Sequence, residues 1–126
     1  MPLVTPKEFL QHACQNKYAV AAFATHNMEI MRAVVAAAEE MEAPIIFQTT
    51  PSTMRYVGIK NMVAMARAAA EQANVPIALH LDHGDSFETV GMSKMFVGEI
   101  GQNLLCWLVK DRQIFHQPTK GASGAR

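Results

Sequence analysis

Three short apolar segments recur along the chain, and each is followed by polar residues. The segments are residues 18–23 (YAVAAF), 43–48 (APIIFQ) and 75–81 (VPIALHL). Continuous apolar segments of this length are typical of strands that are buried on both faces. Strands that are separated by helices pair in parallel, as βαβ units. The sequence therefore predicts an α/β fold in which three buried parallel strands alternate with helices.

Local signals mark where those helices begin. Thr5 with Glu8 three residues later has the pattern of a capping box. Asn27 precedes an alanine-rich segment and is a good helix cap, and Ser52 and Asn61 are the candidates further along. The helices that these signals predict span residues 6–16, residues 28–41, a short segment after Ser52, and residues 61–73.

Each predicted strand ends in a polar cluster. The clusters are His26-Asn27, Gln48-Thr49-Thr50 and Asp82-His83. The carboxyl ends of parallel strands share one edge of a sheet, and α/β enzymes place their active sites at that edge. We therefore expect the three clusters to converge there, although every loop after a strand must also be polar somewhere.

The third cluster belongs to the segment ALHLDHGDSFE, residues 78–88. Strand alternation places His80 and Asp82 on the same side of the predicted strand. A carboxylate beside a metal-binding imidazole can move a proton while the metal polarises a carbonyl. In the other interpretation Asp82 caps a turn, His83 is an exposed loop residue and His80 is a hydrogen-bonded interior histidine. Spacing alone leaves both interpretations open.

Composition narrows the class of protein. Basic and acidic residues balance at 11 each, so the sequence shows none of the basic excess that nucleic-acid binding requires. No apolar segment approaches the roughly 18 residues of a membrane span, and the first residues do not resemble a signal peptide. Cys14 and Cys106 match no metal or redox spacing. We expect a cytoplasmic protein that binds neither membrane nor nucleic acid.

The character of the sequence changes near residue 91. Residues 91–102 contain three glycines, and the segment after residue 113 ends in small and polar residues. Such a composition weakens any prediction of helix. We therefore divide the chain into residues 1–90, which have the α/β pattern, and residues 91–126, which we expect to form an irregular tail.

Two stretches of the first part resemble a known family. They are YAVAAFATHNMEIMRAVVAAAEEMEAPIIFQTTPSTMRYVG and VPIALHLDHGDSFE. The first 90 residues are similar to the N-terminal portion of class II ketose-bisphosphate aldolases, most closely the tagatose-bisphosphate branch, with the fructose-bisphosphate branch near it. The resemblance implies a partial TIM (β/α)8 barrel made of its first three βα units.

The resemblance also implies a chemistry. Family members bind Zn2+ and cleave tagatose or fructose 1,6-bisphosphate reversibly into dihydroxyacetone phosphate and glyceraldehyde 3-phosphate. By this resemblance Asp82 is the catalytic proton carrier, His83 is a zinc ligand and Thr50 is a substrate phosphate contact.

The sequence departs from the family in several respects. Ala24 stands where members commonly have asparagine, and the later zinc histidines and catalytic glutamate have no match. A barrel of this kind takes about 250 residues. We expect a truncated aldolase that is inactive alone and that forms a homo-oligomer or pairs with an intact aldolase. The alternative is a non-catalytic aldolase-like fragment or interaction protein.

Overall fold

The structure is a computed structural model that describes residues 2–84 and 86. The predicted irregular tail, residues 91–126, lies outside the described residues. The elements follow in the order α1 (Pro6–Asn16), β1 (Ala21–Ala24), α2 (Met28–Glu40), β2 (Ile45–Thr49), α3 (Pro51–Val57), α4 (Ile59–Gln72) and β3 (Ile77–Leu81). The predicted alternation of helices and strands is confirmed in the described residues.

The three strands form one sheet in the order β1-β2-β3, and both pairs are parallel. In this register Phe23 lies beside Phe47, and Phe47 lies beside Leu79. Residues that are in register on neighbouring strands share a face of the sheet. The α/β fold class is confirmed, and the arrangement is the one expected for the first units of a parallel barrel.

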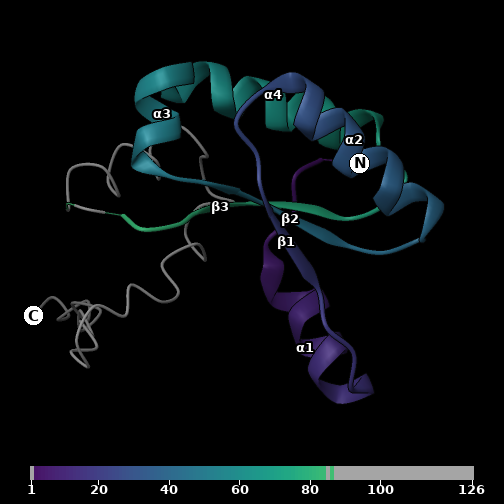
Figure 1. The fold of residues 1–126 in the computed structure, drawn as a ribbon. Coiled ribbons are helices and arrows are strands. Elements are labelled where there is room, and N and C mark those ends of the chain that lie inside the picture. The colour runs from purple at the N-terminus through teal and green to yellow at the C-terminus, as the bar shows by residue number, and fades with distance from the viewer. Residues whose placement is uncertain (1, 85, 87–126) are drawn as a thin grey trace, which may run out of the picture.

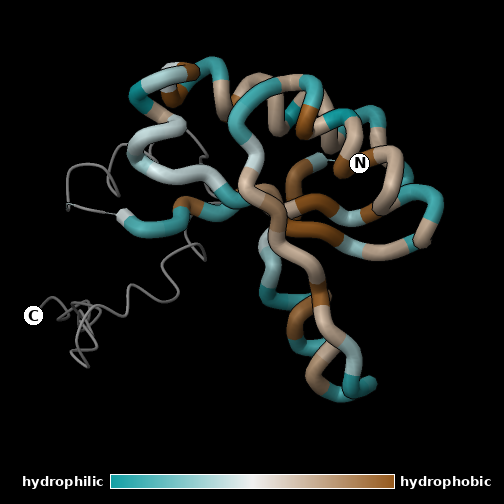
Figure 2. Tube along the Cα trace, in the orientation of Figure 1, coloured by the Kyte–Doolittle hydropathy of each residue, from teal (hydrophilic) through white to brown (hydrophobic). Residues whose placement is uncertain are grey.

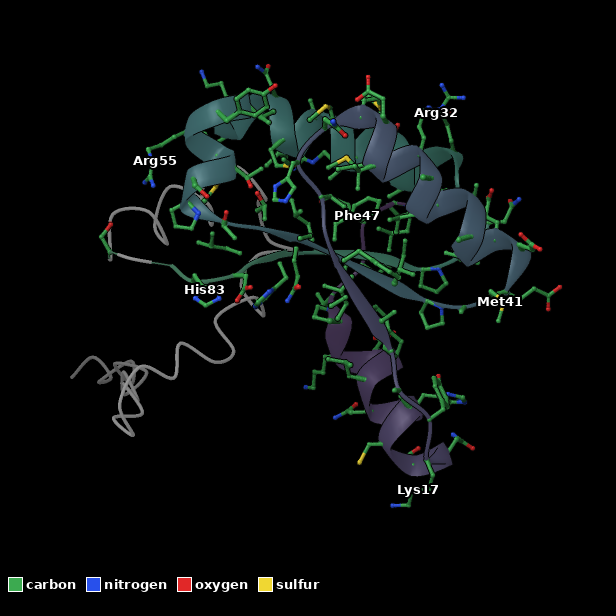
Figure 3. All side chains as sticks on the ribbon, viewed as in Figure 1. Lys17, Arg32, Met41, Phe47, Arg55 and His83 are labelled. Atoms are coloured by element: carbon green, nitrogen blue, oxygen red, sulfur yellow. The ribbon has the colours of Figure 1, made fainter. Side chains whose placement is uncertain are left out.

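One face of the sheet packs against helices. Figure 1 shows α2, α3 and α4 on this face and α1 on the opposite side of the sheet. Phe47 points from β2 toward the helices (Figure 3) and is fully buried, as are Met31 of α2 and Met62 of α4. Apolar residues are concentrated along the strands, whereas polar residues recur in the turns and along the helices (Figure 2). Burial of apolar surface therefore holds β2 and β3 against the helices.

Strand β1 differs from the predicted strand that is buried on both faces. All four of its residues are exposed, and Phe23 retains 41% of its accessible surface whereas its register neighbour Phe47 retains none. Within the described residues β1 is an edge strand with a partner on one side. The prediction of burial on both faces is wrong for β1, because an apolar sequence cannot by itself supply the neighbours that bury a strand.

The predicted helix caps have different outcomes. Asn27 caps α2 as expected, with its side-chain oxygen accepting a hydrogen bond from the amide of Ile30 at 2.9 Å. Thr5 occupies the cap position of α1, but its side chain makes no capping hydrogen bond. The predicted capping box with Glu8 is therefore wrong. Pro6 begins the helix, and its fixed backbone angle favours a helical start without that bond.

The two later helices begin earlier than predicted. Thr50, not Ser52, caps α3, and its hydroxyl accepts from the amide of Thr53 at 3.3 Å. Helix α4 begins after Gly58, so Asn61 lies inside it and donates to the carbonyl oxygen of Val57. Among the described residues, no helix has both the length and the apolar character needed to cross a membrane.

Candidate functional site

Backbone hydrogen bonds bring the carboxyl ends of the three strands to one edge of the sheet. The amide of Thr25 donates to the carbonyl oxygen of Gln48 at 2.9 Å, one residue beyond the end of β1. The amide of Asp82 donates to the carbonyl oxygen of Thr49 at 2.7 Å, one residue beyond β3. We call this edge the rim and define it as residues 25–27, 48–53 and 82–83. The predicted convergence of the three polar clusters is confirmed.

Asp82 and His83 form the part of the rim that follows β3. The imidazole Nε2 of His83 lies 3.5 Å from a carboxylate oxygen of Asp82, an ion pair when the histidine is protonated. The His83 side chain is 81% exposed and that of Asp82 is 35% exposed. Figure 3 shows His83 on the side of the molecule where β2 leads into α3. Both groups are therefore accessible at the rim and close enough to influence each other.

The backbone of His83 is unusual. Its φ of 54° lies in the left-handed region, which few non-glycine residues adopt. Such conformations cost free energy and gather at functional sites, where the surrounding structure maintains them. This backbone accompanies an imidazole that lies beside Asp82 immediately after the strand ends.

His80 lies one layer below Asp82 on the same side of β3. Its neighbour Leu79 is buried in the core against the helices, so His80 and Asp82 occupy the opposite face, as alternation predicts. Gln48 of β2 is beside His80 in the register. Burial lowers the pKa of His80, and the negative charge of Asp82 opposes that shift. The half-buried imidazole is therefore held preferentially in its neutral form.

A cluster of hydroxyl groups and one imidazole joins the other two parts of the rim. Nδ1 of His26 lies 2.7 Å from the hydroxyl of Thr53, which lies 3.1 Å from the hydroxyl of Thr50. The hydroxyl of Ser52 is 2.8 Å from that of Thr50. Sequence analysis did not single out Thr53, although its spacing of three residues from Thr50 is that of a helix cap and its partner.

Among the described residues, the rim does not form a complete metal site. Across residues 2–84 and 86, no group of three or more histidine, cysteine, aspartate or glutamate side chains could hold a metal ion. Zinc sites in enzymes usually take three protein ligands and keep one position open. The exposed imidazole of His83 fits the role of one such ligand, and the carboxylate of Asp82 lies beside it.

Comparison with known proteins gives one family and several relatives. Residues 4–95 match the sequence model of the family described as "Fructose-bisphosphate aldolase class-II". A protein of Thermus caldophilus named "Fructose-bisphosphate aldolase" is 46% identical over 88 residues. That alignment covers 70% of this chain and 28% of the relative.

Solved structures show the same similarity. The YdjI aldolase from Escherichia coli K12 superposes with a TM-score of 0.68 at 28% identity, covering 72% of this chain and 36% of that one. A putative fructose-1,6-biphosphate aldolase from Coccidioides immitis gives a TM-score of 0.59 at 31% identity, covering 64% and 30%. The matched part of the chain therefore covers between 28% and 36% of the length of each of these relatives.

Proposed function

The chain belongs to the class-II fructose-bisphosphate aldolase family, and from that premise we propose that it carries the first part of a zinc-dependent aldolase active site. The proposed reaction is the reversible cleavage of tagatose or fructose 1,6-bisphosphate into dihydroxyacetone phosphate and glyceraldehyde 3-phosphate. One observation carries the proposal. Asp82 and His83 are adjacent and accessible at the carboxyl end of β3, and the backbone of His83 is left-handed.

Asp82 is the proposed acid and base. In the cleavage direction its carboxylate takes the proton from the substrate hydroxyl on the carbon that becomes the aldehyde. The neighbouring carbon–carbon bond then breaks, and its electron pair remains with the dihydroxyacetone phosphate fragment. In the synthetic direction the same carboxyl group returns the proton. A carboxylate that is partly exposed at the rim is accessible for this transfer.

His83 and Thr50 are the proposed binding residues. His83 would serve as one zinc ligand, and zinc supplies electrostatic stabilisation of the negative charge that develops on the substrate. Thr50 would contact a phosphate group of the substrate through its hydroxyl. Its position on the rim shared with Asp82 supports this assignment.

The 126 residues by themselves are proposed to be inactive, because the described part provides His83 and not a set of three metal ligands. A homo-oligomer, or a complex with an intact aldolase, is the proposed active or regulated form. A non-catalytic aldolase-like fragment or interaction protein is the second candidate. Within the described residues β1 has a neighbouring strand on one side only, which favours it because an open strand edge can pair with another chain. We place the protein in the cytoplasm, which suits the free Cys14.

A chimera tests the site assignment. Residues 1–90 are joined to the C-terminal portion of a class-II aldolase, and turnover and zinc content are measured. Asp82→Ala should abolish turnover while zinc still binds, and His83→Ala should lower the zinc content. His12→Ala, on α1 away from the rim, is the control and should change neither. An active chimera that tolerates both rim substitutions would overturn the assignment.

The isolated chain is assayed in parallel. Zinc-dependent cleavage of either ketose bisphosphate by the purified chain, free of host aldolase, would contradict the proposed inactivity. The choice between the two sugars, which differ at one stereocentre, is tested by comparing the kcat/KM values of the active chimera for each.

A further inference from the structure

His26 connects two parts of the rim that are distant in sequence. It follows β1, whereas its partner Thr53 lies in the first turn of α3, and the two side chains meet at 2.7 Å. The Thr53 side chain is buried, at 4% exposure, whereas His26 is exposed. The contact therefore fixes the orientation of a buried hydroxyl from a residue that can itself meet a ligand.

The contact continues to Thr50. The hydroxyl of Thr50 accepts a hydrogen bond from the amide of Thr53 and lies within hydrogen-bond distance of the Thr53 hydroxyl. It also lies 2.8 Å from the hydroxyl of Ser52, which is exposed. His26, Thr53, Thr50 and Ser52 thus form one connected chain of polar groups that ends at the surface.

The Thr53 hydroxyl has a single proton, so within this chain of contacts it can donate either to Nδ1 of His26 or to Thr50. If Nδ1 of His26 is bare, Thr53 donates to it, and the oxygen of Thr53 is available to accept from Thr50. If Nδ1 carries a proton, the ring donates to Thr53, and Thr53 turns to donate to Thr50. The proton of Thr50 is then directed away from Thr53, toward Ser52 or a ligand.

We propose that His26 is a positioning residue of the site, which acts through the Thr53 hydroxyl to set whether Thr50 donates a hydrogen bond to an oxygen of the phosphorylated substrate. The contact between Thr50 and the substrate rests on the proposed function. The coupling of His26 to Thr50 rests on the distances alone, so the two can be tested separately.

The coupling is tested without ligand, by NMR on the isotope-labelled full chain. Thr53→Val removes the hydroxyl at nearly constant volume. It should shift the ring-nitrogen signals of His26 and let the Thr50 side chain average over rotamers. Thr53→Ser should restore both signals. The signals of His12, which pairs with Tyr18 on α1, serve as the internal control.

A second pair of variants changes His26, which is exposed, and leaves the buried Thr53 unchanged. His26→Ala should let the Thr50 side chain average over rotamers, as Thr53→Val does. His26→Asn keeps a polar group near the position of Nδ1, so it should restore the wild-type Thr50 rotamer. If the Thr50 side chain keeps its wild-type rotamer in both Thr53→Val and His26→Ala, the proposed coupling is overturned.

The role in binding is tested with dihydroxyacetone phosphate as the probe. Binding should move the Thr50 signals and shift the His26 ring toward the tautomer that carries its proton on Nδ1. His26→Ala should raise the Kd about tenfold, the effect of losing one hydrogen bond to a charged ligand. An equal Kd in wild type and His26→Ala would overturn the inference and leave the proposed function standing. If the probe leaves wild-type Thr50 unperturbed while the ligand-free result holds, the substrate contact fails and the coupling stands.

Discussion

At the scale of single residues, His83 differs from the other residues with a left-handed backbone in the element that it follows. Three non-glycine residues there have a left-handed backbone: Lys17 with φ of 59°, Glu42 with φ of 50° and His83 with φ of 54°. Lys17 is the C-cap of α1, and Glu42 lies in the turn after α2, where this conformation commonly ends a helix. His83 follows a strand, so no helix ending accounts for its conformation.

We therefore predict opposite effects of His83→Gly on stability and on metal binding. Glycine adopts this backbone without strain, so the free energy of unfolding should stay level or rise by up to about 1 kcal/mol. The zinc content of the aldolase chimera should fall, because the imidazole is lost. Glu42→Gly is the matched control, with a similar change in stability and unchanged zinc. Urea unfolding measures the stability of each variant, and metal analysis measures its zinc content. An unchanged zinc content in His83→Gly would contradict the assignment of His83 as a ligand.

The half-buried imidazole of His80 predicts a dependence of stability on pH. Burial lowers its pKa in the folded state below the usual value of 6.5. As the pH falls, the unfolded chain therefore binds the proton before the folded chain does. The free energy of unfolding is highest above pH 6.5 and decreases as the pH falls from 6.5 to the lower pKa of the folded state. Between about pH 7.5 and about pH 5, the urea midpoint of wild type should fall more than that of His80→Gln. An equal fall in wild type and His80→Gln would refute the prediction.

At the scale of elements, two helix starts with similar sequence signals differ in one hydrogen bond. Asn27 caps α2 through its side chain, whereas Thr5 precedes α1 without a capping bond. Asn27→Ala should therefore cost about 1 kcal/mol of unfolding free energy. Thr5→Ala should stay within about 0.5 kcal/mol. Urea unfolding of both variants checks this, and an equal loss would show that the Thr5 side chain also stabilises its helix.

The outcomes for these elements show what sequence could predict and why. The alternation of strands and helices and the side of β3 that bears Asp82 follow from local periodicity, which the residues themselves contain. The exposure of β1 depends on what lies beside it, and an apolar sequence does not contain that information. The contact of His26 with Thr53 spans 27 residues and arises only when β1 and β2 pair. Local signals predicted the position of the rim, and tertiary pairing determined which of its side chains meet.

At the scale of the whole molecule, the two phenylalanines that lie side by side in the sheet have very different surroundings. Phe47 on β2 is covered by the helix layer and retains no accessible surface, whereas Phe23 on β1 retains 41%. The two residues are register partners on the same face of the sheet. The difference in their exposure therefore shows how far the helices extend over that face. In the part of the chain that the structure describes, the layer covers Phe47 on β2 fully and Phe23 on β1 only in part.

This difference predicts unequal costs for the same substitution. Phe47→Ala removes a fully packed ring and leaves a cavity, so it should cost about 3–5 kcal/mol of unfolding free energy, a large fraction of the stability of a small domain. Phe23→Ala removes a ring that water already reaches, so it should cost about 1–2 kcal/mol. Urea unfolding of the two variants under identical conditions gives the comparison. If both variants lose the same free energy, β1 in solution is covered as fully as β2, by the rest of this chain or by a second copy. In that case the loss in Phe23→Ala should grow with protein concentration if a second copy provides the cover, and should stay constant if the same chain does.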